Sequence, residues 1–250
     1  MSCVIVENED SCVRLRLRNT DANLLTIDVV RELAGTLSDA ARAGRAVLLC
    51  GEDKFFCNGL DLAWALAQPP DDMRAMFLAL GDLVLGMLAA SVPIVGAIRG
   101  HAIGAGKTLF SACDVRYAAA GRVLVGVPEI RLGVPNPFFA DQLLRFTAGD
   151  AAASDLIFTG RLIPAEEAVA CGLVHRIADK TLVEEEAWAR TLELAALPRV
   201  AFTENKSMRT ARLCATIRAE LPARTDRLIE IWNQPQTQDI LCATAARLSH

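Results

Sequence analysis

The sequence predicts an α/β fold with parallel strands, followed by a helical region toward the C-terminus. Between residues 12 and 127, stretches with strand periodicity alternate with amphipathic helical stretches, a pattern typical of parallel sheets crossed by helices. From about residue 181 onward only helical patterns appear. Apolar residues make up 52% of the 250 residues, so the chain can bury a substantial core.

The first predicted elements are a strand, a helix and a second strand. Residues 12–18 alternate apolar and charged side chains, which indicates a strand with one wet face. Thr26 or Asp28 can cap a helix that runs to about Ala43. The apolar face of this helix is formed by Val30, Leu33, Leu37 and Ala41. Residues 45–50 are predicted to form a short buried strand.

The alternation continues through the middle of the chain and then stops. We predict a helix over 72–90, a strand over 93–98, a helix over 104–113, and strands over 115–118 and 123–127. Pro198, Pro222 and Pro235 are expected to punctuate the helices that follow. We place a boundary near residue 195, between a core of residues 1–195 and a helical region of residues 196–250.

Composition argues against several classes of function. The net charge is −4, whereas binding to a nucleic acid backbone requires a basic surface. No apolar stretch predicts a membrane span, and the first residues do not have the pattern of a signal peptide. The eight cysteines include no CxxC pair, so we expect reduced thiols, no metal site and a cytoplasmic protein.

Two glycine-containing segments are candidates for ligand binding. Residues 51–62 (GEDKFFCNGLDL) follow a buried strand, and a turn of this kind can point backbone N–H groups outward. Residues 99–108 (RGHAIGAGKT) place small residues at a helix start, where unpaired N–H groups and the helix dipole favour negative charge. Each segment alone is also compatible with an ordinary turn or a closely packed helix start.

Glu129 lies in a third segment, residues 127–135 (VPEIRLGVP), among apolar neighbours. Burial without a cation would raise the pKa of its carboxyl group, which suits a proton shuttle near neutral pH. The alternative is a surface glutamate paired with Arg131 or another arginine.

Together, the order and spacing of these segments resemble the crotonase (enoyl-CoA hydratase/isomerase) superfamily. The matching motifs are Lys-x-Phe-x-x-Gly-x-Asp-Leu at 54–62, Gly-x-x-x-Gly-x-Gly at 100–106 and Pro-Glu-Ile-x-Leu-Gly at 128–133, and residues 158–177 add a further matching stretch. The resemblance implies a spiral of ββα units with a C-terminal helical trimerisation region, and hence a homotrimer or hexamer.

The resemblance also implies roles for particular residues. The backbone N–H groups of Leu60 and Ala105 would form an oxyanion hole, and Glu129 would be the catalytic base. The substrate would be an acyl thioester of CoA or of an acyl carrier protein, with no separate cofactor. Contacts with substrate or CoA are expected from Phe56, Cys57, Asn58, Gly59, Gly104, Thr108, Asn136 and Lys206, the last toward a CoA phosphate.

Two positions depart from the family pattern. Hydratases of this family hold water between two glutamates, and Thr108 stands where one of these is expected. Glu129 alone could move a proton between C2 and C4 of one enolate, as Δ3,Δ2-enoyl-CoA isomerases do.

Lys107 stands where a small or apolar residue is usual. We expect Lys107 to form a salt bridge behind the helix, and the alternative is that it binds a substrate carboxylate.

The resemblance therefore favours an enoyl-thioester isomerase. Decarboxylation or weak hydration on the same scaffold is the second hypothesis, and a catalytically silent binding subunit is the third. Retention of Glu129 argues against a fully inert protein, and the lack of a basic patch argues against RNA binding.

Overall fold

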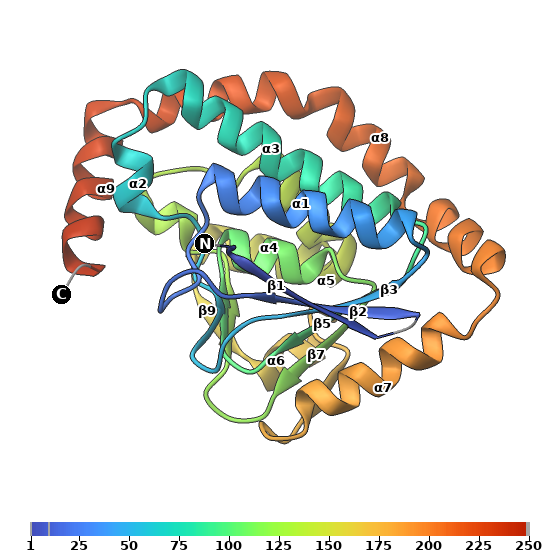
Figure 1. Ribbon diagram of the computed structural model, residues 1–250. Coiled ribbons are helices and arrows are strands. Elements are labelled where there is room, and N and C mark those ends of the chain that lie inside the picture. Colours follow the sequence, from blue (N-terminus) through green and yellow to red (C-terminus); the bar gives the residue numbers. More distant parts are fainter. Residues whose placement is uncertain (1, 10, 249–250) are drawn as a thin grey trace.

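The computed structural model describes residues 2–9 and 11–248 and shows two sheets surrounded by helices (Figure 1). Within these residues, one sheet has six strands in the order β1-β2-β3-β5-β7-β10, and the other has four in the order β4-β6-β8-β9. Neighbouring strands of each sheet are mostly parallel. The predicted α/β class is therefore confirmed.

Successive strands alternate between the two sheets. The larger sheet receives β3 (Ala46–Cys50), β5 (Ile94–Ile98) and β7 (Val115–Ala119), and the smaller sheet receives β4 (Phe55–Cys57), β6 (His101–Ile103) and β8 (Leu124–Gly126). After each pair the chain passes through helical structure, which is α2 (Leu62–Leu66) and α3 (Pro70–Ala89), then α4 (Ala105–Ser111), then η1 (Pro128–Leu132) and α5 (Phe138–Thr159). This repeated ββα turn is the predicted spiral.

The remaining strands complete the sheet edges. The antiparallel hairpin of β1 (Val4–Glu9) and β2 (Cys12–Leu17) begins the larger sheet, and β10 (Arg176–Ala178) ends it parallel to β7. In the smaller sheet, β9 (Leu162–Pro164) pairs antiparallel with β8 and is followed by α6 (Ala165–Ala170).

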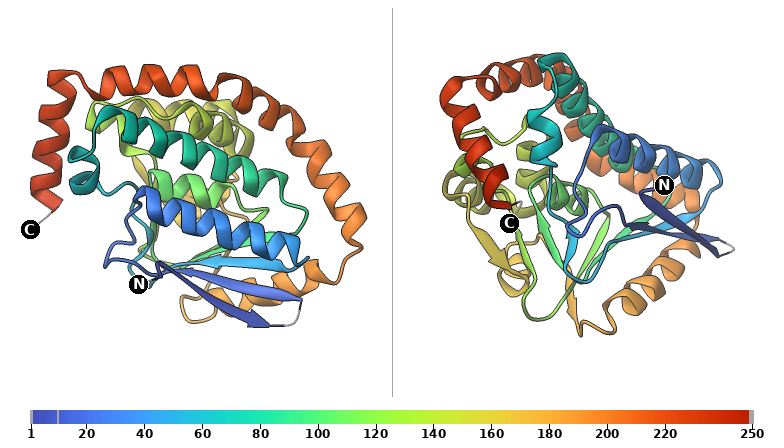
Figure 2. Two further views of the ribbon diagram at one scale, coloured as in Figure 1. Left: turned by 45° about the horizontal axis from the view of Figure 1, so that its top comes forward. Right: turned by 60° about the vertical axis from the view of Figure 1, so that its left-hand side comes forward.

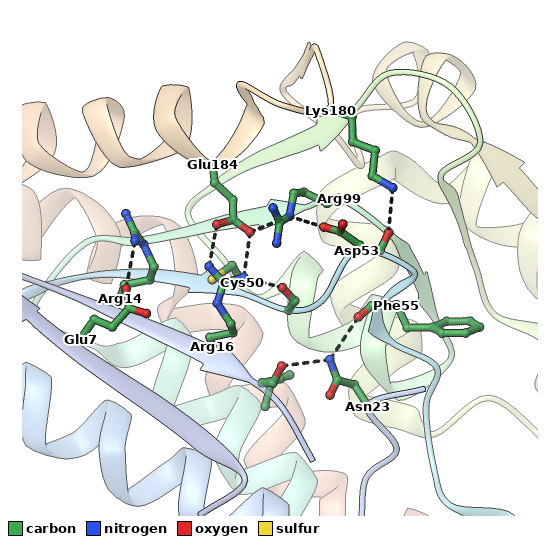
Figure 3. Close-up of polar contacts among 12 residues, drawn as sticks. Glu7, Arg14, Arg16, Asn23, Cys50, Asp53, Phe55, Arg99, Lys180 and Glu184 are labelled. Atoms are coloured by element: carbon green, nitrogen blue, oxygen red, sulfur yellow. Dashed lines mark hydrogen bonds and ion pairs between the residues drawn. The ribbon is translucent and has the colours of Figure 1, made fainter. Parts of the chain in front are cut away.

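Helices cover both faces of the larger sheet, so β3 and β5 are buried along their whole lengths. Figure 1 shows α1 (Ile27–Arg42) and α3 above the sheet and α7 (Val183–Ala195) below it. Glu184 at the start of α7 forms ion pairs with Arg16 at 2.7 Å and Arg99 at 3.0 Å, as Figure 3 shows. These ion pairs tie α7 to the sheet.

Two helices at the C-terminal end pack over the spiral. In Figures 1 and 2, α8 (Arg199–Trp232) lies along α3, and α9 (Pro235–Leu248) turns back beside α2. Pro198 directly precedes α8 and Pro235 begins α9, as predicted. Among the described residues, no helix is long and apolar enough to cross a membrane.

Pro222 does not end a helix, so that expectation is wrong. It lies inside α8, which continues for ten residues beyond it. Ile217, Leu221 and Leu228 are buried on either side of the proline, and Leu221 packs directly against Gly81 of α3. This long-range packing compensates for the helical hydrogen bond that proline cannot donate, a loss of about 3 kcal/mol or more.

Candidate active site

The C-terminal ends of β4, β6 and β8 meet at one cavity of about 330 Å³. These strands are parallel, so the segments that follow them lie at the same edge of the smaller sheet. Those segments are the three singled out in the sequence. Seven predicted site residues line the cavity, namely Asn58, Gly59, Leu60, Gly104, Ala105, Thr108 and Glu129.

The remaining walls of the cavity are apolar and come from helices far apart in the sequence. Among the lining residues are Met76, Phe77 and Leu80 of α3, Leu228 and Trp232 of α8, and Leu248 of α9. The C-terminal helices therefore close the cavity of their own chain. These wall residues could not be recognised as site residues from the sequence, although the predicted amphipathic helix over 72–90 was a signal for some of them.

The N–H groups of Leu60 and Ala105 are both left without a partner in regular secondary structure. A parallel bridge to Leu25 uses the carbonyl of Gly59 at 2.8 Å and the N–H of Asp61 at 3.0 Å, so the N–H of Leu60 faces the other way. Ala105 is the first residue of α4, where the N–H has no acceptor within the helix.

Glycine allows the two segments to approach each other closely. Gly59 and Gly104 have φ values of 90° and 58°, which side chains disfavour. A Cβ atom on Gly59 would lie 3.6 Å from the nitrogen of Ala105 and 3.1 Å from the carbonyl oxygen of Ile103. The turn after β4 thus lies against the start of α4.

Asn23 holds the turn after β4 from behind. Its side chain is buried, and its Nδ2 donates to the carbonyls of Leu17, Phe55 and Phe56 at 3.0, 3.1 and 3.2 Å; Figure 3 shows the bond to Phe55. Asn23 itself has a φ of 49°, a conformation that asparagine tolerates better than most residues. No sequence motif pointed to Asn23 as a residue that positions the site.

Glu129 lies in η1 with its carboxylate over the start of α4. A Cβ atom on Gly104 would lie 3.1 Å from Glu129 Oε1. The other oxygen, Oε2, is buried and has no hydrogen-bond partner among the described residues. Burial raises the pKa of Glu129 to about 7, against smaller opposing effects of a backbone hydrogen bond and the Lys107 charge.

The alternative pairing of Glu129 with Arg131 is not found among the described residues. Arg131 instead donates from Nε to the carbonyl of Thr159 at 3.0 Å. The other ionisable residue among those that line the cavity, Asp61, caps α2 by accepting the N–H of Trp64 at 3.0 Å. Glu129 is therefore the carboxylate with a buried, unpartnered oxygen in the described cavity wall.

Thr108 lines the cavity but supplies no charge. Its hydroxyl donates to the carbonyl of Gly104 at 3.2 Å, and the side chain is buried. Its proton is thus used inside α4, and the position expected for a second glutamate holds a short neutral group.

Three predicted contact residues lie elsewhere than in the cavity wall. Phe56 points into the core and packs edge-on against Phe110, with ring centroids 6.0 Å apart. Cys57 is fully buried, and burial raises the pKa of its thiol to about 12. Asn136 lines a neighbouring hollow beside Phe138 and Arg224.

Lys206 is also outside the cavity wall. Its Nζ lies 2.8 Å from Asp114 Oδ2, and the two side chains are 5% and 20% exposed. Asp114 also accepts the N–H of Ile94 at 2.8 Å. This ion pair joins α8 to the larger sheet, so the structure does not present Lys206 to a CoA phosphate as expected.

Lys107 does not form the salt bridge expected for it. The expected salt bridge is absent from the described residues, and Lys107 Nζ is buried without a hydrogen-bond partner among them. Its side chain is 0% exposed. Lys107 is not among the residues that line the cavity, so the structure gives no support for a contact with a substrate carboxylate there.

The fold is shared with solved enzymes of known class. The human mitochondrial Δ3-Δ2-enoyl-CoA isomerase aligns with a TM-score of 0.94 at 24% identity, over 99% of this chain and 98% of that one. The family model described as enoyl-CoA hydratase/isomerase matches residues 7–240. The chain therefore belongs to the enoyl-CoA hydratase/isomerase family, which confirms the predicted resemblance to the crotonase superfamily.

Relatives within the family carry different names. Cyclohexa-1,5-dienecarbonyl-CoA hydratase of Thauera aromatica is 35% identical over 178 residues, which are 70% of this chain and 67% of the relative. The chromodomain Y-like protein of Mus musculus is 25% identical over 243 residues, 94% of this chain but only 41% of that protein. The chain thus spans less than half the length of that relative.

Proposed function

We propose that this protein is an enoyl-thioester isomerase that moves a double bond from C3 to C2 of an acyl chain. The observation that carries the proposal is the polarity of the cavity wall. Among the described lining residues, Glu129 is the carboxylate with a buried, unpartnered oxygen, and Thr108 supplies no second carboxylate. One base without a second carboxylate to hold a water suits proton transfer better than hydration.

The reaction begins with the thioester carbonyl between two N–H groups. The N–H groups of Leu60 and Ala105 donate to its oxygen and stabilise the negative charge that develops there. Glu129 removes a proton from C2, and the electron pair spreads over the carbonyl and the C3–C4 double bond. The same carboxyl group then returns the proton at C4. The double bond ends between C2 and C3, so no co-reactant is required.

The shape of the cavity supports this chemistry. Its mostly apolar walls, from α3, α8 and α9, suit an acyl chain and disfavour free water near the dienolate. The fold likeness to the human mitochondrial Δ3-Δ2-enoyl-CoA isomerase is compatible with the same reaction class. The pKa of about 7 for Glu129 places a useful fraction of base and acid at neutral pH.

Hydration is the second candidate function. The observation that favours it is the 35% identity to the cyclohexa-1,5-dienecarbonyl-CoA hydratase of Thauera aromatica. Measured addition of water to a 2-enoyl thioester by the native protein would support this candidate over isomerisation.

Glu129→Gln tests the proposed base while preserving its shape. We expect 3-enoyl to 2-enoyl conversion to slow by ~10²–10⁴-fold, because a positioned base contributes about that much. Thioester affinity, measured by calorimetry, should change little because the N–H donors and the walls remain. Mass spectrometry of the products follows the conversion.

The matched control is Asp61→Asn, since Asp61 is the other carboxylate of the described cavity wall and asparagine also caps helices well. This variant should retain turnover within a few-fold. Equal turnover in native protein and Glu129→Gln would remove Glu129 from the mechanism. Thioester binding without turnover in either form would instead support a binding subunit.

A further inference from the structure

Three buried polar atoms without a hydrogen-bond partner among the described residues gather around α4. They are Lys107 Nζ, Ser111 Oγ and Glu129 Oε2. Lys107 and Ser111 are four residues apart in the helix and so lie on the same face. The Glu129 carboxylate packs over Gly104, three residues before Lys107.

The buried lysine is unusual in its chemistry. An ammonium group that leaves water without gaining hydrogen bonds destabilises a protein, so such groups are rare unless they are paired or functional. A methionine would fill a similar volume with no such cost. Burial lowers the pKa of Lys107 to about 8, which still leaves the group mostly protonated at neutral pH. A positive charge is therefore retained inside the molecule.

The charged and titratable groups that act on Lys107 come from four elements. Glu129 of η1 exerts the strongest side-chain charge effect, followed by Asp141 of α5, Arg116 of β7 and Cys171 at the end of α6. The two carboxylates favour the ammonium form and Arg116 opposes it. Conversely, Lys107 is the one side-chain charge found to act on Glu129 among the described residues.

The other charges near Lys107 are already satisfied. Asp141 lies 2.9 Å from Arg145 Nε, and the Arg116 guanidinium donates to the carbonyls of Cys113 and Leu173, each at 2.8 Å. Glu129 is thus the carboxylate near Lys107 that still has a buried, unpartnered oxygen.

We propose that Lys107 is a positioning residue for the proton shuttle, whose buried positive charge on α4 holds the Glu129 carboxylate ionised. This inference rests on the proposed function and deepens it. Desolvation in the cavity favours the neutral acid of Glu129, which cannot remove a proton from C2. The Lys107 charge opposes that effect without touching the substrate, because it does not line the cavity.

The test is Lys107→Met, which removes the charge at similar volume. The pKa of Glu129 is measured in the unliganded protein by infrared spectroscopy with carboxyl-labelled glutamate, and the spectrum of Glu129→Gln is subtracted to isolate its band. We expect the pKa to rise by about one unit, because a nearby opposite charge shifts a carboxyl by at least that much. At pH values below the pKa of Glu129, turnover of the variant should then be about tenfold lower than that of the native protein. The turnover reached at high pH should change little.

Ser111→Ala is the matched control, because it removes an unpartnered polar atom from the same helix face without changing charge. Its Glu129 pKa should equal that of the native protein. Lys107→Gln is a second neutral variant, used if the methionine variant does not fold. An unmoved Glu129 pKa in a folded neutral variant would overturn the inference. If the native protein showed no isomerisation, only the proposed function would be contradicted, because the spectroscopic titration of Glu129 needs no turnover.

Discussion

Burial moves the pKa values of Glu129 and Lys107 toward each other, to about 7 and about 8. In the narrow range between these values, the carboxylate is mostly ionised while the ammonium is still mostly protonated. Both groups are buried at a cost in stability. Their joint presence beside α4 is therefore explained better by chemistry than by packing.

The free-energy cost of burying Lys107 can be measured from the pH dependence of protein stability. Its pKa falls from 10.5 to about 8 on folding, so between these values the unfolded chain binds more protons and stability rises with pH. Below pH 8 the group costs roughly 3 kcal/mol. Lys107→Met should therefore raise the free energy of unfolding by roughly that amount at pH 7, and by less toward pH 10, in urea titrations. A methionine variant less stable than the native protein at pH 7 would contradict the assignment.

At the scale of one side chain, we expect Thr108 to favour proton transfer over hydration. Thr108→Glu places a second carboxylate in the cavity wall. The described lining residues include no lysine or arginine that would pair with it. We expect it to introduce measurable hydration of a 2-enoyl thioester, which the native protein should show weakly or not at all. Thr108→Gln, of similar size but uncharged, should not gain this activity. Robust hydration by the native protein would contradict this role of Thr108.

At the scale of elements, the start of α4 provides a backbone donor rather than a side chain. Ala105 is the first helical residue, a position where proline fits with little strain. Ala105→Pro should remove one N–H and lower kcat/KM by ~10²–10³-fold, with little change in melting temperature. Ala105→Ser keeps the N–H and should keep activity. Full activity in a folded proline variant would exclude this N–H from the oxyanion hole.

At the scale of the whole molecule, large apolar side chains remain exposed on the isolated chain. Phe158 of α5 is 70% exposed, and Val200 and Met208 of α8 are 79% and 71% exposed. Surfaces of this kind are often covered by subunit contacts. We expect a trimer, or a hexamer built from trimers, in sedimentation velocity experiments at micromolar concentration. A monomer under those conditions would contradict this prediction.

The sequence by itself determined the elements with clear periodicity and the loops that meet at the cavity. The helix expected to end near Ala43 is α1, which ends at Arg42, and the strand expected over 12–18 is β2, Cys12–Leu17. These segments are long enough for a buried face to repeat several times. Glu129, Leu60 and Ala105 could be placed at one site because their motifs occur in family order; their catalytic roles remain predictions.

Only the tertiary structure decided which side chains are covered and by what. β4, β6 and β8 have three residues each, too few for a readable period, and exist because neighbouring strands pair with them. α8 continues through Pro222 because α3 packs against it. Lys206 forms an ion pair with Asp114, and Lys107 is buried without a hydrogen-bond partner among the described residues. A local pattern shows which residues share a face, but burial and charge pairing depend on elements distant in the sequence that fold against that face.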